Sequence, residues 1–423
     1  MTEQQIAELA PEFNAYLKTF RPYFATAAGF AHLGTYARGL ISDLERKSVE
    51  PIALAGGCAV RTLQEFLTWH RWDQQAVRDK LQRRIVACHM PAPGTPHDSL
   101  GVIGLVDETS TVKKGTETPG VQRQYCGAVG KVENCVVTVH LGYLHGRFKA
   151  LIDADLYLPT SWADDRERCR NVDIPDTLDH RPKWRIALDQ IAHALGNGVH
   201  FDWIVFDEGY GGKPGFLFGL DALGLHGIGE VPKNFPCWPT LPAYRSAQAP
   251  FAAKRVDNAA CRGKPFRKKK WRTITLPHQT EGPAIWRAKA GLVHLSKDGL
   301  PTERKYWLIV AKNEKTGEAK YFVSNAPPKT ALKRLLRVAF RRWHVEHAFR
   351  VAKSEIGFTH YEGRNYLGLM RHLILCQLVM LFVAEQTDRL RGEKSRDHHG
   401  ADGPGAERDL PPLAATQLQA ARG

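Results

Sequence analysis

The sequence lacks any long uninterrupted apolar run. Its longest apolar stretch, from Leu373 to Ala384, is broken by Gln377 and is shorter than the ~20 residues that cross a bilayer. The first residues, MTEQQIAELAPEF, lack the apolar segment of a secretory signal. None of the 8 cysteines forms a C-x-x-C pair, which argues against a structural zinc site and a disulfide scaffold. We therefore expect a cytoplasmic protein that does not span a membrane.

Acidic residues are scarce in two stretches of the chain, and the positive charge gathers there. The whole chain has 59 basic and 44 acidic residues and a net charge of +15. Residues 245–290 have a net charge of +10 and residues 329–353 of +7, so the remainder is slightly negative. Several clustered cations release counterions when they bind a polyanion. This concentration favours nucleic acid as a partner over a merely solvated basic face.

The N-terminal region is rich in apolar residues at helical spacing. Val60, Leu63 and Phe66 are one example, and similar spacing recurs throughout the region. Proline and glycine in residues 91–96 then indicate a linker. We therefore predict a helical domain over residues 1–95.

The next region alternates short apolar segments with one helical segment. The apolar, strand-like segments are residues 102–106, 134–144, 148–158 and 203–206, and the helical segment is residues 183–195. This order predicts a mixed α/β sheet over residues 96–224.

The rest of the chain divides by composition. Residues 225–328 are rich in proline and glycine and contain strand-like pieces, so we expect a β-rich basic insertion. Helical spacing returns over residues 329–386, which we expect to complete the α/β core. Residues 387–423 are rich in charge, glycine and proline, and we expect them to form a disordered tail.

Two apolar segments end in the same way. Residues 102–106 and residues 203–206 are each followed by Asp-Glu, which places Asp107 and Asp207 just after an expected strand. The carboxyl ends of strands are where α/β sheets carry their sites. Carboxylates on neighbouring strands suit a shared Mg²⁺ or Mn²⁺ ion. A single acid here more often caps a turn, and the repetition makes a shared cation an equally good interpretation.

Glu346 is the only acid in a basic helical stretch, residues 329–353, that contains 8 basic residues. On a helix it shares one face with Arg342, Arg350 and Lys353. Ordinary ion pairing between residues four apart explains this arrangement. The alternative is a carboxylate directed at a metal ion, flanked by cations that hold phosphates. The residues alone leave both interpretations open.

Four sequence blocks carry a more specific signal. They are VDET and KKG within residues 106–115, GVQRQYCG and GKVENC within 120–135, FDEGYG at 206–211, and RRWHVEHAFRVAK at 341–353 followed by GF and HYEGR. Together these blocks resemble the DDE-type transposases of bacterial insertion sequences, over about residues 58 to 384. The resemblance implies an RNase H-like core. It also fits a family variant with a β-strand insertion between the second aspartate and the glutamate.

The resemblance further implies the catalytic chemistry. Asp107, Asp207 and Glu346 would be the catalytic, metal-binding residues, holding two Mg²⁺ ions that Mn²⁺ can replace. Two such ions ~4 Å apart bracket a phosphodiester, one preparing the nucleophile and the other stabilising the leaving oxygen. Asp107 would bridge both ions.

Several basic residues are expected to bind DNA. The family pattern Tyr-x2-Arg-x3-Glu-x6-Lys fits Arg342, Glu346 and Lys353, whereas Ala339 occupies the tyrosine position. The match implies that two cations of this helix hold phosphates near the cut. The expected DNA-binding residues are Arg342, Arg350, Lys353, Lys113, Lys114, Arg267, Lys268, Lys269, Lys270 and Arg272.

We therefore expect a cut-and-paste DNA transposase that acts on double-stranded transposon ends and target DNA. It would work in the bacterial nucleoid as a homodimer. A catalytically silent DNA-binding descendant and a stand-alone RNase H-like nuclease remain the alternatives.

The N-terminal helices would either recognise DNA ends by a groove-inserted helix or serve as a scaffold. Aromatics beside cations, as at Trp238, Trp271 and Trp286, either stack on unpaired bases or pack in the insertion's core.

Overall fold

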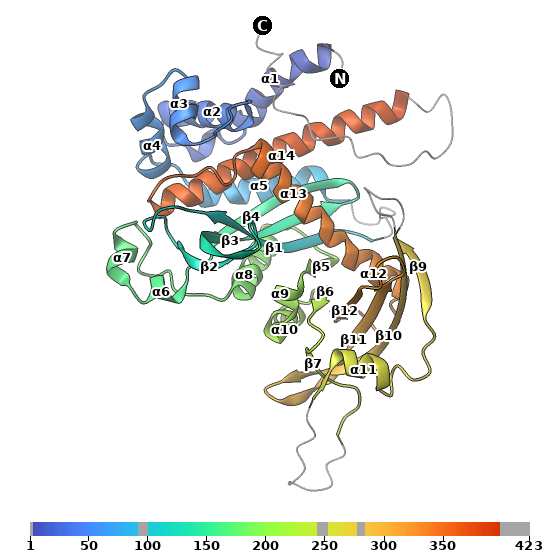
Figure 1. Ribbon diagram of the computed structural model, residues 1–423. Coiled ribbons are helices and arrows are strands. Elements are labelled where there is room, and N and C mark those ends of the chain that lie inside the picture. Colours follow the sequence, from blue (N-terminus) through green and yellow to red (C-terminus); the bar gives the residue numbers. More distant parts are fainter. Residues whose placement is uncertain (1–2, 92–99, 243–252, 277–283, 398–423) are drawn as a thin grey trace.

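The computed structural model describes residues 3–91, 100–242, 253–276 and 284–397, with side chains placed from residue 8 to residue 391 within these ranges. The expected domain boundary near residue 95 lies outside the described residues. Figure 1 shows the chain coloured along its length.

Helices fill the N-terminal region, as the spacing of its apolar residues predicts. They are α1 (Glu3–Lys18), α2 (Ala27–Ile41), α3 (Val49–Ala55), α4 (Val60–Thr68) and α5 (Gln74–His89), with a 3₁₀ turn at Arg21–Tyr23. Two of them begin at a side-chain cap. Thr26 accepts a hydrogen bond from the Gly29 amide at α2, and Asp73 accepts one from the Ala76 amide at α5, which satisfies donors that the first turn leaves open.

The central sheet begins with four antiparallel strands, β1 to β4, and continues through two parallel strands. Its strands are β1 (Ile103–Val112), β2 (Gln122–Cys126), β3 (Lys131–His145), β4 (Phe148–Leu156), β5 (Trp203–Phe206) and β6 (Gly227–Val231). β3 pairs antiparallel with β4 and β1, β1 runs parallel to β5, and β5 runs parallel to β6. This strand order is consistent with the expected RNase H-like core, so the α/β prediction is confirmed.

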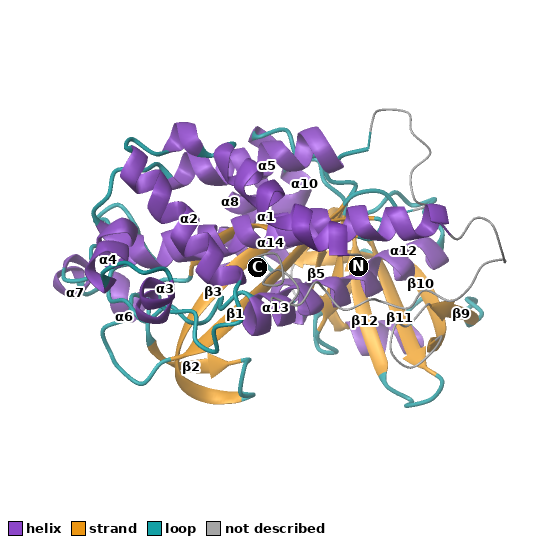
Figure 2. Cartoon of the chain, turned by 90° about the horizontal axis from the view of Figure 1, so that it is seen from above, coloured by secondary structure: helices purple, strands orange, loops and turns teal. Residues whose placement is uncertain are grey.

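Short helices connect these strands. They are α6 (Thr160–Ala163), α7 (Arg166–Arg170), α8 (Lys183–Gly196), α9 (Glu208–Gly211) and α10 (Pro214–Ala222). α8 bridges the antiparallel unit to β5 and packs on β3. α8 and α10 lie on one side of the sheet, opposite the C-terminal helices (Figures 1 and 2).

The region after β6 is a β-rich insertion, as its composition predicts. It contains β7 (Pro236–Trp238), β8 (Lys254–Arg255), α11 (Val256–Arg262), β9 (Arg272–Leu276), β10 (Ala284–Lys297), β11 (Leu300–Asn313) and β12 (Ala319–Ser324). β12 pairs antiparallel with β6, so the insertion does not form a separate sheet. It extends the central sheet in the order β6-β12-β11-β10-β7-β8, and β9 also pairs with β10.

Three helices follow the insertion: α12 (Leu332–Ala339), α13 (Trp343–Glu355) and α14 (Tyr366–Asp397). A 3₁₀ turn at Phe340–Arg342 separates α12 from α13, where helical spacing alone predicts one continuous helix. The Phe340 ring packs 4.7 Å from the Trp286 ring and 5.7 Å from the Phe322 ring, centroid to centroid. Packing against the insertion therefore accompanies the break.

Helix α14 lies across the core. By length and composition its Tyr366–Arg391 part is apolar enough to cross a bilayer, but 89% of its apolar window is buried within the protein. It packs against β4 and against α2, α4 and α5. It is thus a buried core helix and not a membrane span.

The N-terminal helices share their core with α14. The Tyr16 hydroxyl donates to the Leu378 carbonyl at 2.8 Å. The Arg371 guanidinium, only 4% exposed, donates to the Trp72 carbonyl at 2.8 Å. These buried contacts join α1 and the α4–α5 connection directly to the C-terminal helix.

Helix α14 also corrects the expected start of the tail. Residues 387–397 are helical, although we expected disorder from residue 387. Arg, Glu and Lys are frequent in this stretch, and they are good helix formers. The stretch richest in glycine and proline begins near residue 400 and lies outside the described residues.

Candidate active site

Asp107 lies near the middle of β1 and not at its end. The parallel pairing of β1 with β5 stops at Leu105 and Val205, while antiparallel pairing with β3 carries β1 on to Val112. The expectation that this strand ends at Val106 is therefore wrong. Asp107 nevertheless lies two residues past the last parallel pair, at the edge where β1 and β5 part.

Asp207 stands at the carboxyl end of β5, as expected. It is also the N-cap of α9, where its carboxylate accepts a hydrogen bond from the Tyr210 amide at 3.3 Å. Capping is therefore one role of this side chain. The cap holds the carboxylate at the sheet edge next to β1.

Arg342 joins the third acid to the first. Its Nη1 donates to Asp107 Oδ2 at 3.2 Å, and its Nη2 donates to the Glu346 carboxylate. The Glu346 side chain, in the first turn of α13, is 49% exposed, whereas the Asp107 side chain is 13% exposed. The ion pair expected between residues four apart thus forms, and the same guanidinium also reaches the buried aspartate.

Both aspartates sit in an environment that disfavours their charge. Burial, followed by the charge of Asp207, raises the pKa of Asp107 to about 7, and Arg342 opposes this rise. Burial also raises the pKa of Asp207, and the charge of Glu108 acts in the same direction. A pair of buried carboxylates with raised pKa values carries more negative charge than one guanidinium neutralises.

This excess charge fits a hard divalent cation. Carboxylate oxygens are the donors that Mg²⁺ and Mn²⁺ prefer, and a dication would relieve the repulsion between Asp107 and Asp207. Among the residues that the structure describes, however, no three His, Cys, Asp or Glu side chains gather into a metal-binding group. Arg342 links Glu346 to Asp107 by hydrogen bonds to both carboxylates.

A cleft of about 640 Å³ opens beside these residues. Asp107 and Glu346 both line it. The other lining residues are Glu108, Thr109, Ser110, Tyr125, Gly127, Ala128, Val137, Lys183, Phe349, Arg350, Lys353 and Ser354. The cleft therefore combines carboxylates with three cations contributed by α8 and α13.

Two of the expected DNA-binding cations, Arg350 and Lys353, lie in this cleft. Burial lowers the pKa of Lys353, and the charge of Asp107 partly offsets that effect. Lys353 is therefore close enough to the first aspartate to feel its charge. Arg350 is exposed and lies one turn after Glu346, where a phosphate in the cleft can approach it.

Lys113 and Lys114 are separated in the structure. The Lys113 ammonium donates to the Tyr361 carbonyl, and burial lowers its pKa. It thus holds the segment that connects α13 to α14. Lys114 is exposed, so the two neighbours differ in surroundings although the sequence presents them as a pair.

The basic run of the insertion lies on its surface. Residues 267–270 and Arg272 are exposed. Trp271 is 39% exposed, and the Lys289 ammonium lies 4.9 Å from its ring centroid. Trp238 and Trp286 are 6% and 4% exposed, so core packing accounts for these two. Trp271 alone of the three keeps an accessible ring.

Sequence reasoning missed two features of the cleft. The Lys183 ammonium at the start of α8 donates to Glu108 Oε1 at 2.6 Å, and no spacing signal connects residues so far apart. Tyr125, in the second sequence block, is 66% exposed and lines the cleft. None of the strand-like segments expected from the sequence included Tyr125, which lies on β2, so its place in the cleft was not predicted.

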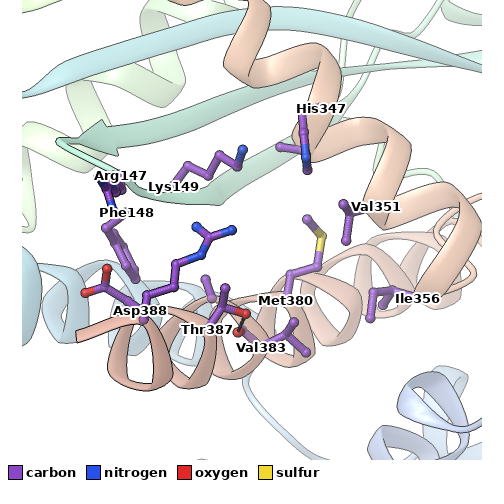
Figure 3. A pocket seen from close by; sticks show the side chains of 13 residues that line it. Arg147, Phe148, Lys149, His347, Val351, Ile356, Met380, Val383, Thr387 and Asp388 are labelled. Carbon is purple, nitrogen blue, oxygen red and sulfur yellow. Dashed lines mark hydrogen bonds between the residues drawn. The ribbon is translucent and has the colours of Figure 1, made fainter. Parts of the chain in front are cut away.

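A second pocket lies between α13, α14 and the β3–β4 turn (Figure 3). Phe148, Val351 and Met380 give it an apolar wall, and the cationic residues Arg147 and Lys149 lie at its edge. None of the three candidate acids lines it. It is therefore distinct from the acidic cleft.

Comparison with known proteins places the chain in a family. The model of the DDE superfamily endonuclease family matches residues 19–283. A curated relative, a "Probable transposase for insertion sequence element IS701" from Microchaete diplosiphon, is 31% identical over 225 residues, which are 52% of this chain and 54% of the relative. The aligned part thus spans about half of that relative's length.

The fold is of the RNase H-like nuclease class. Because the family match covers more than half of the sequence, the chain belongs to the DDE superfamily endonucleases. The match includes Asp107 and Asp207 and ends before Glu346.

Proposed function

We propose that this protein is a DNA transposase that cleaves DNA strands at the ends of an insertion sequence and joins them to a target. The observation that carries the proposal is the pairing of Asp107 with Asp207 at one sheet edge, beside a cleft lined by cations. Family membership and the similarity to a probable transposase support the same conclusion.

In this proposal, Asp107, Asp207 and Glu346 hold divalent cations, two Mg²⁺ ions or Mn²⁺ in their place. Such ions, when bound, would activate a water molecule or a DNA 3′-hydroxyl as the nucleophile and stabilise the leaving oxygen. Glu346 would help to hold the ion in place of its ion pair with Arg342. The exposure of its side chain, 49%, leaves it room to do so.

The cations of the cleft act on the DNA backbone. The pKa of Arg342 stays raised because the charges of Asp107 and Glu346 outweigh the effect of burial, so the guanidinium remains charged in the site. We propose that Arg342, Arg350 and Lys353 hold the phosphates that flank the cut. Cations held beside the scissile phosphate stabilise the charge of a phosphoryl transition state.

The remaining basic surface would bind DNA away from the cut. Arg272, residues 267–270 and Lys114 are exposed and are proposed to contact phosphates.

The N-terminal helices would recognise the DNA ends or act as a scaffold. Helices α3 and α4 pack together across a short turn in which Gly57 has a φ of +66°, and α4 exposes Arg61 to solvent. This arrangement suits a groove-inserted helix. We further propose that the protein acts as a homodimer in the bacterial nucleoid.

A cleavage assay with Glu346→Gln tests the proposal. Purified protein is given a labelled duplex that carries the element's end, with Mg²⁺ or Mn²⁺. We expect wild type to cut this DNA, and the variant to lose at least ~100-fold in rate while binding the DNA as before, because only the metal-dependent step is removed.

Glu355→Gln is the matched control, since this residue lies on the opposite face of the same helix. Normal cleavage by Glu346→Gln would remove Glu346 from the proposed site. Cleavage of an RNA–DNA hybrid in place of the DNA end would favour a stand-alone nuclease, and no cleavage by wild type would favour a silent DNA-binding descendant.

A further inference from the structure

The β2–β3 hairpin presents an aromatic side chain to the acidic cleft. Tyr125, Gly127 and Ala128, at and next to the hairpin's turn, line the same cleft as Asp107 and Glu346. The strand positions pair Tyr125 with Val132 across the hairpin. The hairpin thus forms part of the wall of the same cleft that the α13 cations Arg350 and Lys353 line.

This wall is rigidly attached to the strand that carries the first aspartate. The Ser110 hydroxyl of β1 accepts hydrogen bonds from the Ala128 amide at 3.1 Å and from the Cys126 thiol at 3.3 Å. Both bonds lie three residues along β1 from Asp107. The Cys126 side chain is fully buried, so the hairpin turn has a small core of its own. The hairpin backbone next to Tyr125 is therefore fixed relative to β1, which carries Asp107.

The Tyr125 ring and its neighbours are unusually exposed for apolar groups. Tyr125 is 66% exposed, Val132 55% and Val129 46%. Contiguous exposed apolar side chains beside a functional cleft indicate a binding surface. Arg123, on the same face of β2 as Tyr125, has a side chain that is 71% exposed.

The charge of the cleft indicates what this surface binds. Arg350 and Lys353 line the same cleft as the hairpin, and such cations attract a phosphate backbone. An aromatic ring beside a backbone-binding groove is the arrangement by which proteins hold single bases, because every base has a face for stacking. A protein partner would gain little from cations so close to the proposed metal site.

We propose that Tyr125 stacks on a nucleobase next to the scissile phosphate and holds that base out of the duplex. This inference rests on the proposed function, since it names how the same cleft engages its DNA. Tyr125 is here a positioning residue. The stacked base orients the strand so that the phosphate meets Asp107 and its partners, and the exposed valines pack against the adjoining sugars.

The test uses full-length protein and end duplexes that carry 2-aminopurine at single positions on either side of the cut, in Ca²⁺ to prevent cleavage. We expect a fluorescence change at one flanking position with wild type and with Tyr125→Phe, which keeps the ring. With Tyr125→Ala the change should disappear, and cleavage in Mg²⁺ should slow about tenfold, the effect expected for one stacked base.

A mismatch at the flanking pair provides the second arm. Because the base is then already unpaired, the defect of Tyr125→Ala should shrink to about twofold if the ring holds an unpaired base. Leu300→Ala is the control, since this residue is 61% exposed at the β10–β11 turn. It should leave both signals unchanged.

The outcomes separate this inference from the proposed function. If wild type cuts the end and Tyr125→Ala cuts equally fast with the same fluorescence, the stacking role is overturned while the transposase proposal stands. If wild type cuts no DNA, the proposed function itself fails. A changed oligomeric state of Tyr125→Ala with unchanged fluorescence would make the hairpin a subunit interface and would also overturn the inference.

Discussion

At the scale of single residues, the site is a compromise between stability and chemistry. Asp107 is nearly buried and its pKa is raised to about 7. When the pKa of an acid is higher in the folded protein than in the unfolded chain, ionisation of that acid destabilises the folded state. The loss of stability grows as the pH rises from the unfolded pKa to the folded pKa, and it is complete above the folded pKa. The Asp107 carboxylate thus lowers the stability of the folded protein, which a residue with a purely structural role would not do.

We expect Asp107→Asn to stabilise the metal-free protein at pH 8 and to abolish cleavage. A pKa displacement of ~3 units corresponds to about 4 kcal/mol, and the removal of the ion pair with Arg342 offsets part of it. We therefore expect a gain of about 1–2 kcal/mol in the free energy of unfolding, a trade between function and stability seen in other active sites.

Urea unfolding at pH 8 and pH 5 measures this effect. The gain should be smaller at pH 5, where the folded carboxyl is protonated. A variant that is less stable than wild type at both pH values would contradict the raised pKa of Asp107.

At the scale of elements, one buried carboxylate connects α14 to α5. Glu385 accepts hydrogen bonds from Arg84 at 2.6 and 2.8 Å and from His89 at 3.2 Å. Burial alone would raise the pKa of Glu385, but the hydrogen bonds from His89 and Arg84 outweigh it, so the pKa is lowered. A lowered folded pKa stabilises the protein above the unfolded value, and this contribution disappears as the pH falls through the folded value.

Glu385→Gln should therefore destabilise the protein at pH 7 by about 2 kcal/mol, because it leaves a half-buried guanidinium without its charge partner. The destabilisation should shrink as the pH falls through the lowered pKa of Glu385, where the wild-type carboxylate also gains a proton. Thermal or urea unfolding of both proteins across this range checks the prediction. Glu362→Gln is the control, since that side chain is 50% exposed, and it should change stability little.

At the scale of the whole molecule, charge and topology act together. The sheet carries the basic insertion at one end and the acidic site in its centre, so DNA crossing the site can also meet the insertion. Removing one cation that binds a phosphate should reduce the slope of log affinity against log salt by about 0.9.

Replacing residues 268–270 by alanine tests this arrangement. We expect weaker binding of end DNA and a slope reduced by about 1–3, according to how many of the three lysines touch phosphates. Replacing Lys18, Arg71 and Arg185, which are exposed and lie outside the insertion, removes the same charge from other surfaces and should leave the slope nearly unchanged. Equal slopes for the two triple variants would show that residues 268–270 do not contact phosphates.

The sequence allowed much of this fold to be predicted, because strand and helix periodicities are local. The β-rich insertion, the N-terminal helices and the mixed sheet all follow from such patterns. The break before α13 and the length of β1 did not, because Phe340 packs on distant Trp286 and β3 extends the ladder beyond Val106. Both features depend on partners far away in the chain.

The candidate site divides in the same way. The sequence by itself determined which side chains are available: two aspartates after apolar runs and one glutamate in a basic helix. Only the tertiary structure decided their relations, because distance and burial arise when segments far apart in the chain pack together. It placed Arg342 between Glu346 and Asp107, turned Lys113 inward, and set the exposed ring of Tyr125 beside the acids.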